Sequence, residues 1–96
     1  MRSPKSEYPM TKILRLDDVV QPEAVRFGAR LKKRREELGL TQPQLSEQTG
    51  ITAAYISTVE NAKANPTLDM MVRLAKVVDL EVWDMIRPQP DANENQ

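Results

Sequence analysis

The side chains best placed to do chemistry lie on one predicted helix over residues 53–61. If Ile56, Val59 and Glu60 point inward, the 3.6-residue period turns a set of small and polar side chains outward. The outward residues are Ala54, Thr58 and Asn61, flanked by Tyr55 and Ser57. Methyl groups can contact the methyl group of thymine, and a threonine hydroxyl can pair with a donor or an acceptor on a base edge. The chemistry that this helix offers is therefore noncovalent contact, of the kind that exposed base edges accept.

The leading turns of this helix contain no arginine, lysine, asparagine or glutamine. Those residues make the usual bidentate hydrogen bonds to guanine and adenine, so this mode of base reading is not expected. Ala53 and Ala54 begin the helix and would lie deepest in the groove. Specificity should then depend on thymine methyl groups and on the shape of the duplex.

Two short helices joined by a glycine turn are predicted to position this face. Gly50 ends a helix over 41–50, Ile51 follows as an apolar plug, and Thr52 can cap the helix after it. The first of the two helices has its own start signals. These are Thr41 as the cap, Gln44 at the capping-box position, Pro43 in the first turn and Leu45 pointing inward.

Three further helices complete the predicted fold. A helix from Glu23 to Gly39 places Ala24, Phe27, Leu31, Arg35 and Leu38 on one stripe. After the cap Thr67, the predicted inward positions are Leu68, Met71, Leu74, Ala75 and Val78. A last short helix carries Val82, Trp83, Met85 and Ile86. The predicted fold class is all-α, a compact five-helix bundle that contains a helix-turn-helix.

The domain is predicted to span residues 23–87. Residues 1–22 contain three prolines and mixed charges, which predicts an arm that is irregular or forms a short strand. The β-prone residues of this arm are 13–16 and 19–20. Residues 88–96 are polar and are predicted to form a disordered tail.

Two charged residues fall on inward helix faces. Arg35 lies on the apolar stripe of the first helix, and Glu60 lies beside Ile56 and Val59. Because an unpaired buried charge is costly, the two are predicted to form a structural ion pair. The alternative is that both side chains extend to solvent.

Composition excludes several classes of function. The 96 residues contain no cysteine and no histidine, so disulfides, thiolate metal sites and the usual zinc ligands are not expected. No nucleophile elbow, paired carboxylates or glycine-rich phosphate loop is found, which argues against an enzyme and against a cofactor. No apolar run is long enough for a membrane span, and the start of the chain is unlike a signal peptide. A cytoplasmic protein is expected.

The net charge is zero, but the charges are segregated along the chain. Basic residues crowd the segment 26–35, whereas acidic residues dominate after Pro66. The basic end is therefore expected to approach phosphate while the acidic end faces away.

The run from Phe27 to Ile86 resembles the helix-turn-helix domain of the Xre or lambda-Cro-like repressors. The residues that carry the resemblance are Leu31, Arg35, Gly39, Leu40, Thr41, Gln42, Leu45, Gly50, Ile51, Thr52, Ile56, Ser57, Glu60, Asn61, Pro66, Leu74, Ala75, Leu80, Met85 and Ile86. Two positions depart from the family, which usually has glycine where this chain has Ala62 and often has glycine where it has Asp79. Both are expected in left-handed backbone.

The resemblance implies that the helix 53–61 is a recognition helix in the major groove of a palindromic operator. Gln42 would lie over the phosphate backbone, and Asn61 and Lys63 would hold phosphates. The predicted DNA contacts are Gln42, Thr52, Ala53, Ala54, Tyr55, Ser57, Thr58, Asn61 and Lys63. The alternative for Asn61 is a helix C-cap without a ligand. The basic run 32–34 is not included, because charged helix faces are usually only solvated.

A homodimer is expected, because one recognition helix contacts few base pairs. The interface candidates are Val82, Trp83, Met85 and Ile86, with Trp83 as the anchor or, alternatively, a core residue. The predicted function is a transcriptional regulator, a repressor that needs no inducer pocket. The alternative is an antitoxin of a toxin–antitoxin pair that binds a toxin through residues 11–20. A restriction-modification controller is a further variant.

Overall fold

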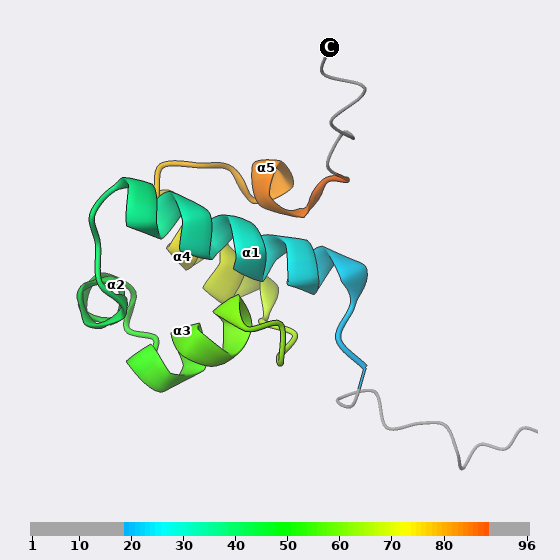
Figure 1. Cartoon of the computed structure of the whole chain (residues 1–96), viewed down its shortest axis with the longest axis horizontal. Coiled ribbons are helices and arrows are strands. Elements are labelled where there is room, and N and C mark those ends of the chain that lie inside the picture. The colour runs from blue at the N-terminus through cyan, green and yellow to red at the C-terminus, as the bar shows by residue number, and fades with distance from the viewer. Residues whose placement is uncertain (1–18, 89–96) are drawn as a thin grey trace, which may run out of the picture.

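The computed structural model describes residues 19–88, which form five α-helices and no strand (Figure 1). The helices are α1 (Pro22–Glu37), α2 (Gln42–Thr49), α3 (Ala53–Glu60), α4 (Leu68–Val77) and α5 (Val82–Ile86). The all-α, five-helix fold class predicted from the sequence is confirmed. Of the β-prone residues of the arm, 13–16 lie outside the described residues, as does the tail beyond Pro88, whereas residues 19–20 are irregular and form no strand.

Helix α1 begins one residue before the predicted start, because Pro22 occupies the first helical position, where a missing N–H costs nothing. It ends at Glu37, and Gly39 follows with a φ of 74°. The backbone N–H of Leu40 donates to the carbonyl of Arg35 and closes the helix end. Leu38 therefore lies beyond the last helical residue and is 42% exposed, so its predicted place on the buried stripe is wrong.

Side-chain caps start the next three helices as predicted. Thr41 and Gln44 form a reciprocal capping box at the start of α2. Thr52 accepts from the N–H of Tyr55 at the start of α3, and Thr67 accepts from the N–H of Met70 at the start of α4. These caps satisfy backbone donors that have no partner within a helix.

The two residues predicted in left-handed backbone adopt it. Ala62 has a φ of 60° after α3, and Asp79 has a φ of 61° after α4. In both turns a backbone N–H donates back to the preceding helix, as from Lys63 to the carbonyl of Thr58. A left-handed residue thus ends each of these two helices and allows the closing hydrogen bond to form.

The core is built from side chains of all five helices. The fully buried side chains are Phe27, Leu31, Leu45, Ile56, Val59, Leu74, Val78 and Met85. Leu68 was predicted to point inward, but it is 65% exposed. It is the first residue of α4, and the buried residues of this helix, Leu74 and Ala75, lie in its second half. No helix within residues 19–88 is both long and apolar enough to cross a membrane.

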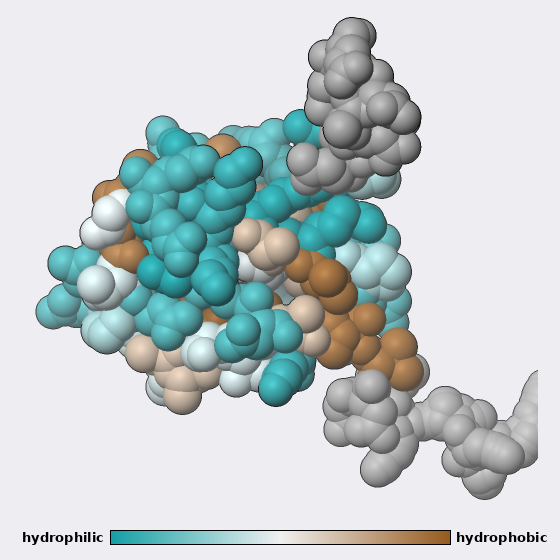
Figure 2. Space-filling view, in the orientation of Figure 1, coloured by the Kyte–Doolittle hydropathy of each residue, from teal (hydrophilic) through white to brown (hydrophobic). Residues whose placement is uncertain are grey.

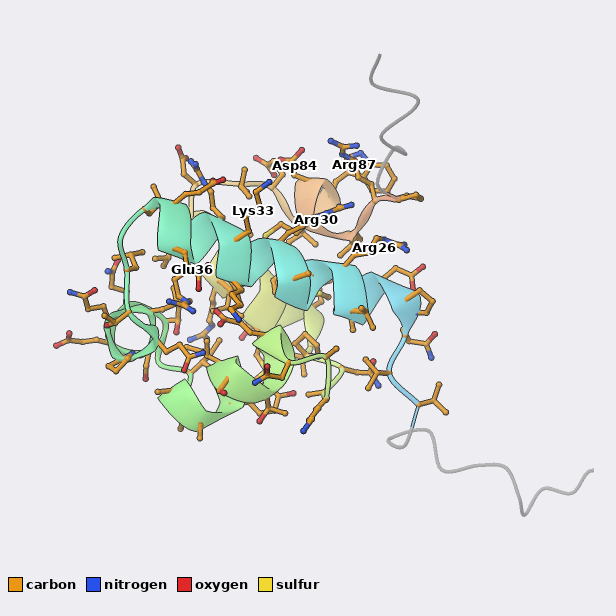
Figure 3. The ribbon with its side chains drawn as sticks, viewed as in Figure 1. Arg26, Arg30, Lys33, Glu36, Asp84 and Arg87 are labelled. Atoms are coloured by element: carbon orange, nitrogen blue, oxygen red, sulfur yellow. The ribbon has the colours of Figure 1, made fainter. Side chains whose placement is uncertain are left out.

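Three arginines on α1 join this helix to the C-terminal part of the chain. Arg26, Arg30 and Arg34 donate to the backbone carbonyls of Ile86, Asp84 and Val78, at 2.7, 2.9 and 2.9 Å. They lie one turn apart. Arg26 and Arg30 face α5, whereas α3 lies on the other side of α1 (Figures 1 and 3), and Arg34 reaches the end of α4. The expectation that the basic segment approaches phosphate stays a prediction, and these three residues also have a structural role.

The chain before α1 is attached to the loop after α3. The side chain of Asn65 donates to the carbonyl of Val19 and accepts from the N–H of Gln21. Figure 2 shows apolar surface where the chain leads into α1, and Val19 and Val25 in this part of the chain are exposed. The amide of Asn65 thus fixes this segment next to the end of α3.

Candidate nucleic-acid interface

Helix α3 presents one face to the core and one to solvent. Ile56, Val59 and Glu60 are buried, as predicted, whereas Ala54 on the opposite face is exposed. The remaining predicted contact residues on the helix are half-buried, namely Ala53, Tyr55, Ser57 and Thr58. Thr52, Asn61 and Lys63 flank it and are exposed. All the predicted contact residues of the segment 52–63 therefore keep some solvent exposure, although Tyr55 also packs against the hydrophobic core.

Internal hydrogen bonds limit what two of these side chains can offer a base. The hydroxyl of Thr58 donates to the carbonyl of Ala54 at 3.0 Å, which leaves its oxygen to act as an acceptor. The side-chain amide of Asn61 donates to the carbonyl of Ser57 at 2.9 Å, and Asn61 is the C-cap of α3. The C-cap alternative for Asn61 is thus present in the structure, and a phosphate contact from this residue stays a prediction.

A buried carboxylate attaches α3 to the two helices before it. Glu60, whose side chain is 1% exposed, accepts from Arg35 Nε at 2.8 Å and Nη2 at 2.9 Å. The predicted ion pair is therefore present, and the alternative in which both side chains extend to solvent is wrong. Arg35 Nη1 also donates to the carbonyl of Leu40. The hydrogen bond to Glu60 is the main cause that raises the pKa of Arg35, against the opposing effect of burial.

Gln42 is the second partner of this carboxylate and supplies its third hydrogen bond. Its side-chain amide donates to Glu60 Oε1 at 2.9 Å, and the residue is half-buried at the start of α2. One side chain on α3 thus accepts hydrogen bonds from both α1 and α2. The predicted phosphate contact of Gln42 stays a prediction, because the side chain that would make it is hydrogen-bonded inside the protein.

The turn between α2 and α3 depends on two residues that the sequence analysis missed. Thr49 is buried, and its hydroxyl donates to the carbonyl of Leu45 and accepts from the N–H of Ile51. Arg73 on α4 donates to the carbonyl of Thr49 at 3.3 Å. Gly50 between them has a φ of 79°. A threonine directly before the turn glycine is a signal for this bond, whereas Arg73 gave no local signal.

The arrangement α2, turn, α3 has counterparts among known proteins. Residues 31–82 match the helix-turn-helix family, which is more than half of the 96 residues. The chain belongs to the Xre-like helix-turn-helix family. The family that the sequence resembles is therefore confirmed, and α2 and α3 are the two helices of its helix-turn-helix.

Two curated relatives of this helix-turn-helix protein are regulators. It is 28% identical over 66 residues to the HTH-type transcriptional regulator SinR of Bacillus licheniformis, covering 68% of this chain and 60% of SinR. It is 31% identical over 74 residues to the HTH-type transcriptional regulator PuuR of Escherichia coli (strain K12), covering 77% of this chain and 40% of PuuR. The chain thus spans only part of the length of either regulator.

One solved structure is matched over nearly its whole length, unlike the two regulators. The restriction-modification controller protein C.AhdI from Aeromonas hydrophila superposes with a TM-score of 0.62 at 31% identity. The match covers 68% of this chain and 98% of C.AhdI. The likeness supports the fold assignment around α2 and α3.

The four predicted interface residues on α5 differ in their exposure to solvent. Trp83 is 63% exposed, so its alternative role as a core residue is wrong. Val82 and Ile86 are half-buried. Met85 is fully buried among the core residues, and its assignment to a dimer interface is therefore corrected: it closes the bundle.

Proposed function

We propose that this chain is a cytoplasmic DNA-binding protein that regulates transcription by placing α3 in the major groove of double-stranded DNA. The observation that carries the proposal is the exposed face around Ala54, on a helix whose opposite face is held by Glu60, Arg35 and Gln42. A helix attached in this way keeps its orientation when it meets the duplex, so less conformational entropy is lost on binding. The relatives named above, two of them transcriptional regulators, support the same function.

The proposed contacts fall into two groups. Bases would be contacted by Ala53, Ala54, Tyr55, Ser57 and Thr58, with methyl groups and a hydroxyl acceptor as the reading groups. Phosphates would be contacted by Gln42, Thr52, Asn61 and Lys63. Lys63 carries the only positive charge of the nine, so specificity would depend on fit and on DNA shape more than on charge.

The proposed assembly is a homodimer on a palindromic operator, with half-sites about 10 bp apart. Trp83 would be the centre of the interface, since a large exposed aromatic side chain is a typical anchor. A dimer that occupies a promoter would act as a repressor. A toxin-binding role for residues 11–20 is not part of the proposal, because all of them but Val19 and Val20 lie outside the described residues.

The test is fluorescence anisotropy with a labelled duplex from upstream of the gene and a random duplex of the same length. Ala54→Leu should weaken binding to the upstream duplex about tenfold or more, because the larger side chain displaces the helix from the base edges. Binding to random DNA should change little. Ala29→Leu, at an exposed position on α1, is the matched control.

Two results would contradict the proposal. Equal loss of affinity for both duplexes on Ala54→Leu would mean that α3 does not read bases. Affinity that does not fall as salt is raised would mean that phosphates are not contacted.

A further inference from the structure

Two threonines at α3 use their hydroxyl groups in opposite ways. Thr52, the N-cap of the helix, accepts from the backbone N–H of Tyr55 at 3.1 Å, whereas Thr58 donates to the backbone carbonyl of Ala54 at 3.0 Å. A hydroxyl group has one hydrogen to donate and two lone pairs that accept. Thr52 therefore keeps its hydrogen for a partner outside the protein, whereas Thr58 keeps only its lone pairs.

The hydroxyl oxygen of Thr58 is open to such an outside partner. Thr58 is half-buried and lies one helical turn after the exposed Ala54, on the outward side of α3. Within residues 19–88, no N–H or O–H group donates to this oxygen. Both lone pairs are therefore available, and the hydrogen bond to the carbonyl of Ala54 limits the rotation of the hydroxyl group.

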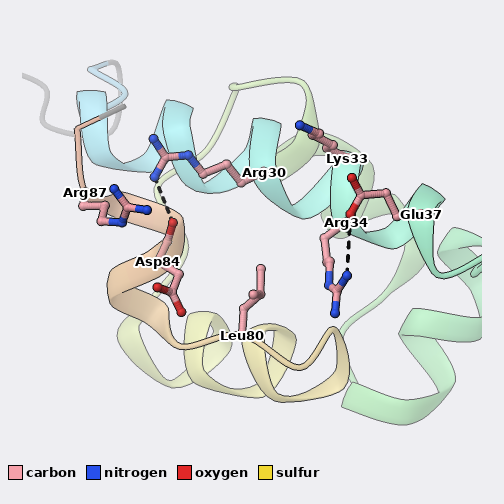
Figure 4. A pocket seen from close by; sticks show the side chains of 7 residues that line it. All are labelled: Arg30, Lys33, Arg34, Glu37, Leu80, Asp84 and Arg87. Atoms are coloured by element: carbon pink, nitrogen blue, oxygen red, sulfur yellow. Dashed lines mark hydrogen bonds and ion pairs between the residues drawn. The ribbon is translucent and has the colours of Figure 1, made fainter. Parts of the chain in front are cut away.

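Positive side chains do not compete with Thr58 on this helix. Residues 53–60 contain no arginine, lysine, asparagine or glutamine. Arg30, Arg34 and Arg87 instead line a charged hollow between α1 and α5, on the side of α1 that faces away from α3 (Figure 4). Discrimination between bases by hydrogen bonds is therefore left to neutral groups on α3.

The edges of the bases differ in what they offer a hydroxyl group. In the major groove, adenine and cytosine present an amino group that donates, whereas guanine and thymine present a keto oxygen that accepts. A hydroxyl group that rotates freely pairs with either kind. Thr58 accepts from an amino group without any rearrangement. To donate to a keto oxygen it must first break its hydrogen bond to Ala54, and otherwise its lone pairs face the oxygen.

We propose that Thr58 is a specificity-determining residue that selects an amino base, adenine or cytosine, over a keto base, guanine or thymine. The inference rests on the proposed DNA-binding function and names the class of base that α3 reads at one position of each half-site. Each base pair has one amino and one keto base in the major groove, so the selection fixes which strand carries the amino group. Thr52 keeps its hydrogen and instead suits a phosphate oxygen, which only accepts.

A selection from a pool of randomised duplexes tests the proposal with the full chain and two variants. Thr58→Val replaces the hydroxyl group by a methyl group, whereas Thr58→Ser keeps a hydroxyl group that can donate to the same carbonyl. The parent protein and Thr58→Ser should share a preference for adenine or cytosine at one position of each half-site. Thr58→Val should lose this preference, about fivefold to tenfold in relative affinity, and keep the preferences elsewhere. Circular dichroism verifies that both variants fold.

A second measurement removes the amino group from the base. In the selected duplex, the adenine at that position is replaced by purine, or the cytosine by pyrimidin-2-one, each of which lacks only the amino group. The affinity of the parent protein, measured by fluorescence anisotropy, should fall about fivefold to tenfold. The affinity of Thr58→Val should change little. Because the same duplexes are used for both proteins, this double-mutant cycle cancels any effect of the analogue on the duplex itself.

Three results would overturn the role of Thr58 while sequence-specific binding persists. These are the same preferences for Thr58→Val as for the parent protein at every position, a preference of the parent protein for guanine or thymine at the position that changes, and equal losses for both proteins with the base analogue. In each case the proposed DNA-binding function would stand. If the parent protein enriched no sequence at all, the proposed function would fail, and this inference with it.

Discussion

The carbonyl oxygen of Val59 on α3 occupies the place where a β-carbon on Gly28 of α1 would stand. The two helices approach so closely that backbone meets backbone at this point. Gly28 is buried inside α1 and has no positive φ, so the requirement is for space and not for conformational freedom. The distance of α3 from α1 is thus set by the absence of one side chain.

Gly28→Ala should lower the free energy of unfolding by about 1–3 kcal/mol, because the added methyl group meets backbone atoms that cannot rotate away. Urea denaturation measures the change. Gly39→Ala is a useful comparison, since its β-carbon would meet nothing within 4 Å and only the φ of 74° opposes it. If Gly28→Ala were as stable as the parent protein, the close approach of α1 and α3 would be disproved.

Arg35→Ala should lower the free energy of unfolding by about 3–5 kcal/mol, because it leaves the buried carboxylate of Glu60 without its main partner. Asp69→Ala breaks the exposed pair with Arg73 and should cost at most about 1 kcal/mol. Because the pKa of Arg35 is raised in the folded protein, its contribution is full at neutral pH and is lost only as pH rises through that raised pKa. An unchanged urea midpoint for Arg35→Ala would contradict this role.

Ala62→Gly should raise stability by about 1 kcal/mol, because glycine adopts a φ of 60° without the strain that a β-carbon causes. Asp79→Gly should raise it less, since aspartate tolerates left-handed backbone better than alanine does. Thermal unfolding detects both, with a shift of several degrees expected for the first. A melting temperature that falls for Ala62→Gly would show that the alanine makes a contact that outweighs its strain.

Trp83→Ala should leave the folded monomer intact but weaken self-association, because the indole is mostly exposed. Sedimentation equilibrium over a range of protein concentrations measures this. Met85→Ala, two residues along α5, should instead lower the free energy of unfolding by about 2–5 kcal/mol, because it leaves a cavity in the core. Self-association that is the same with and without Trp83 would move the interface away from α5.

Local signals in the sequence predicted the helix ends well. The caps Thr41, Thr52 and Thr67 act within four residues of themselves, so their partners are already fixed by the order of residues. The left-handed residues Ala62 and Asp79 could be placed because the family has glycine there. The ion pair of Arg35 and Glu60 could be predicted because each charge lies on an otherwise apolar face.

Predictions from periodicity failed where a helix begins or ends. Leu38 and Leu68 have the spacing of core residues, yet both are exposed. Leu38 is the C-cap of α1 and Leu68 is the first residue of α4, and at these helix ends no other helix packs against the side chain. Trp83 and Met85 lie on the same short helix, and its pattern did not show which of them faces the core. That choice depends on where α1 lies relative to α5.

By itself, the sequence determined the all-α fold, the caps of α2, α3 and α4 and the outward face of α3, because these follow from interactions between residues close together in the chain. The tertiary structure alone decided that Arg26, Arg30 and Arg34 bind the carbonyls of the C-terminal helices, and that a charged hollow forms beside them. It also placed a carbonyl of α3 against Gly28. Such contacts join segments thirty to sixty residues apart, and their geometry is fixed only when the core packs.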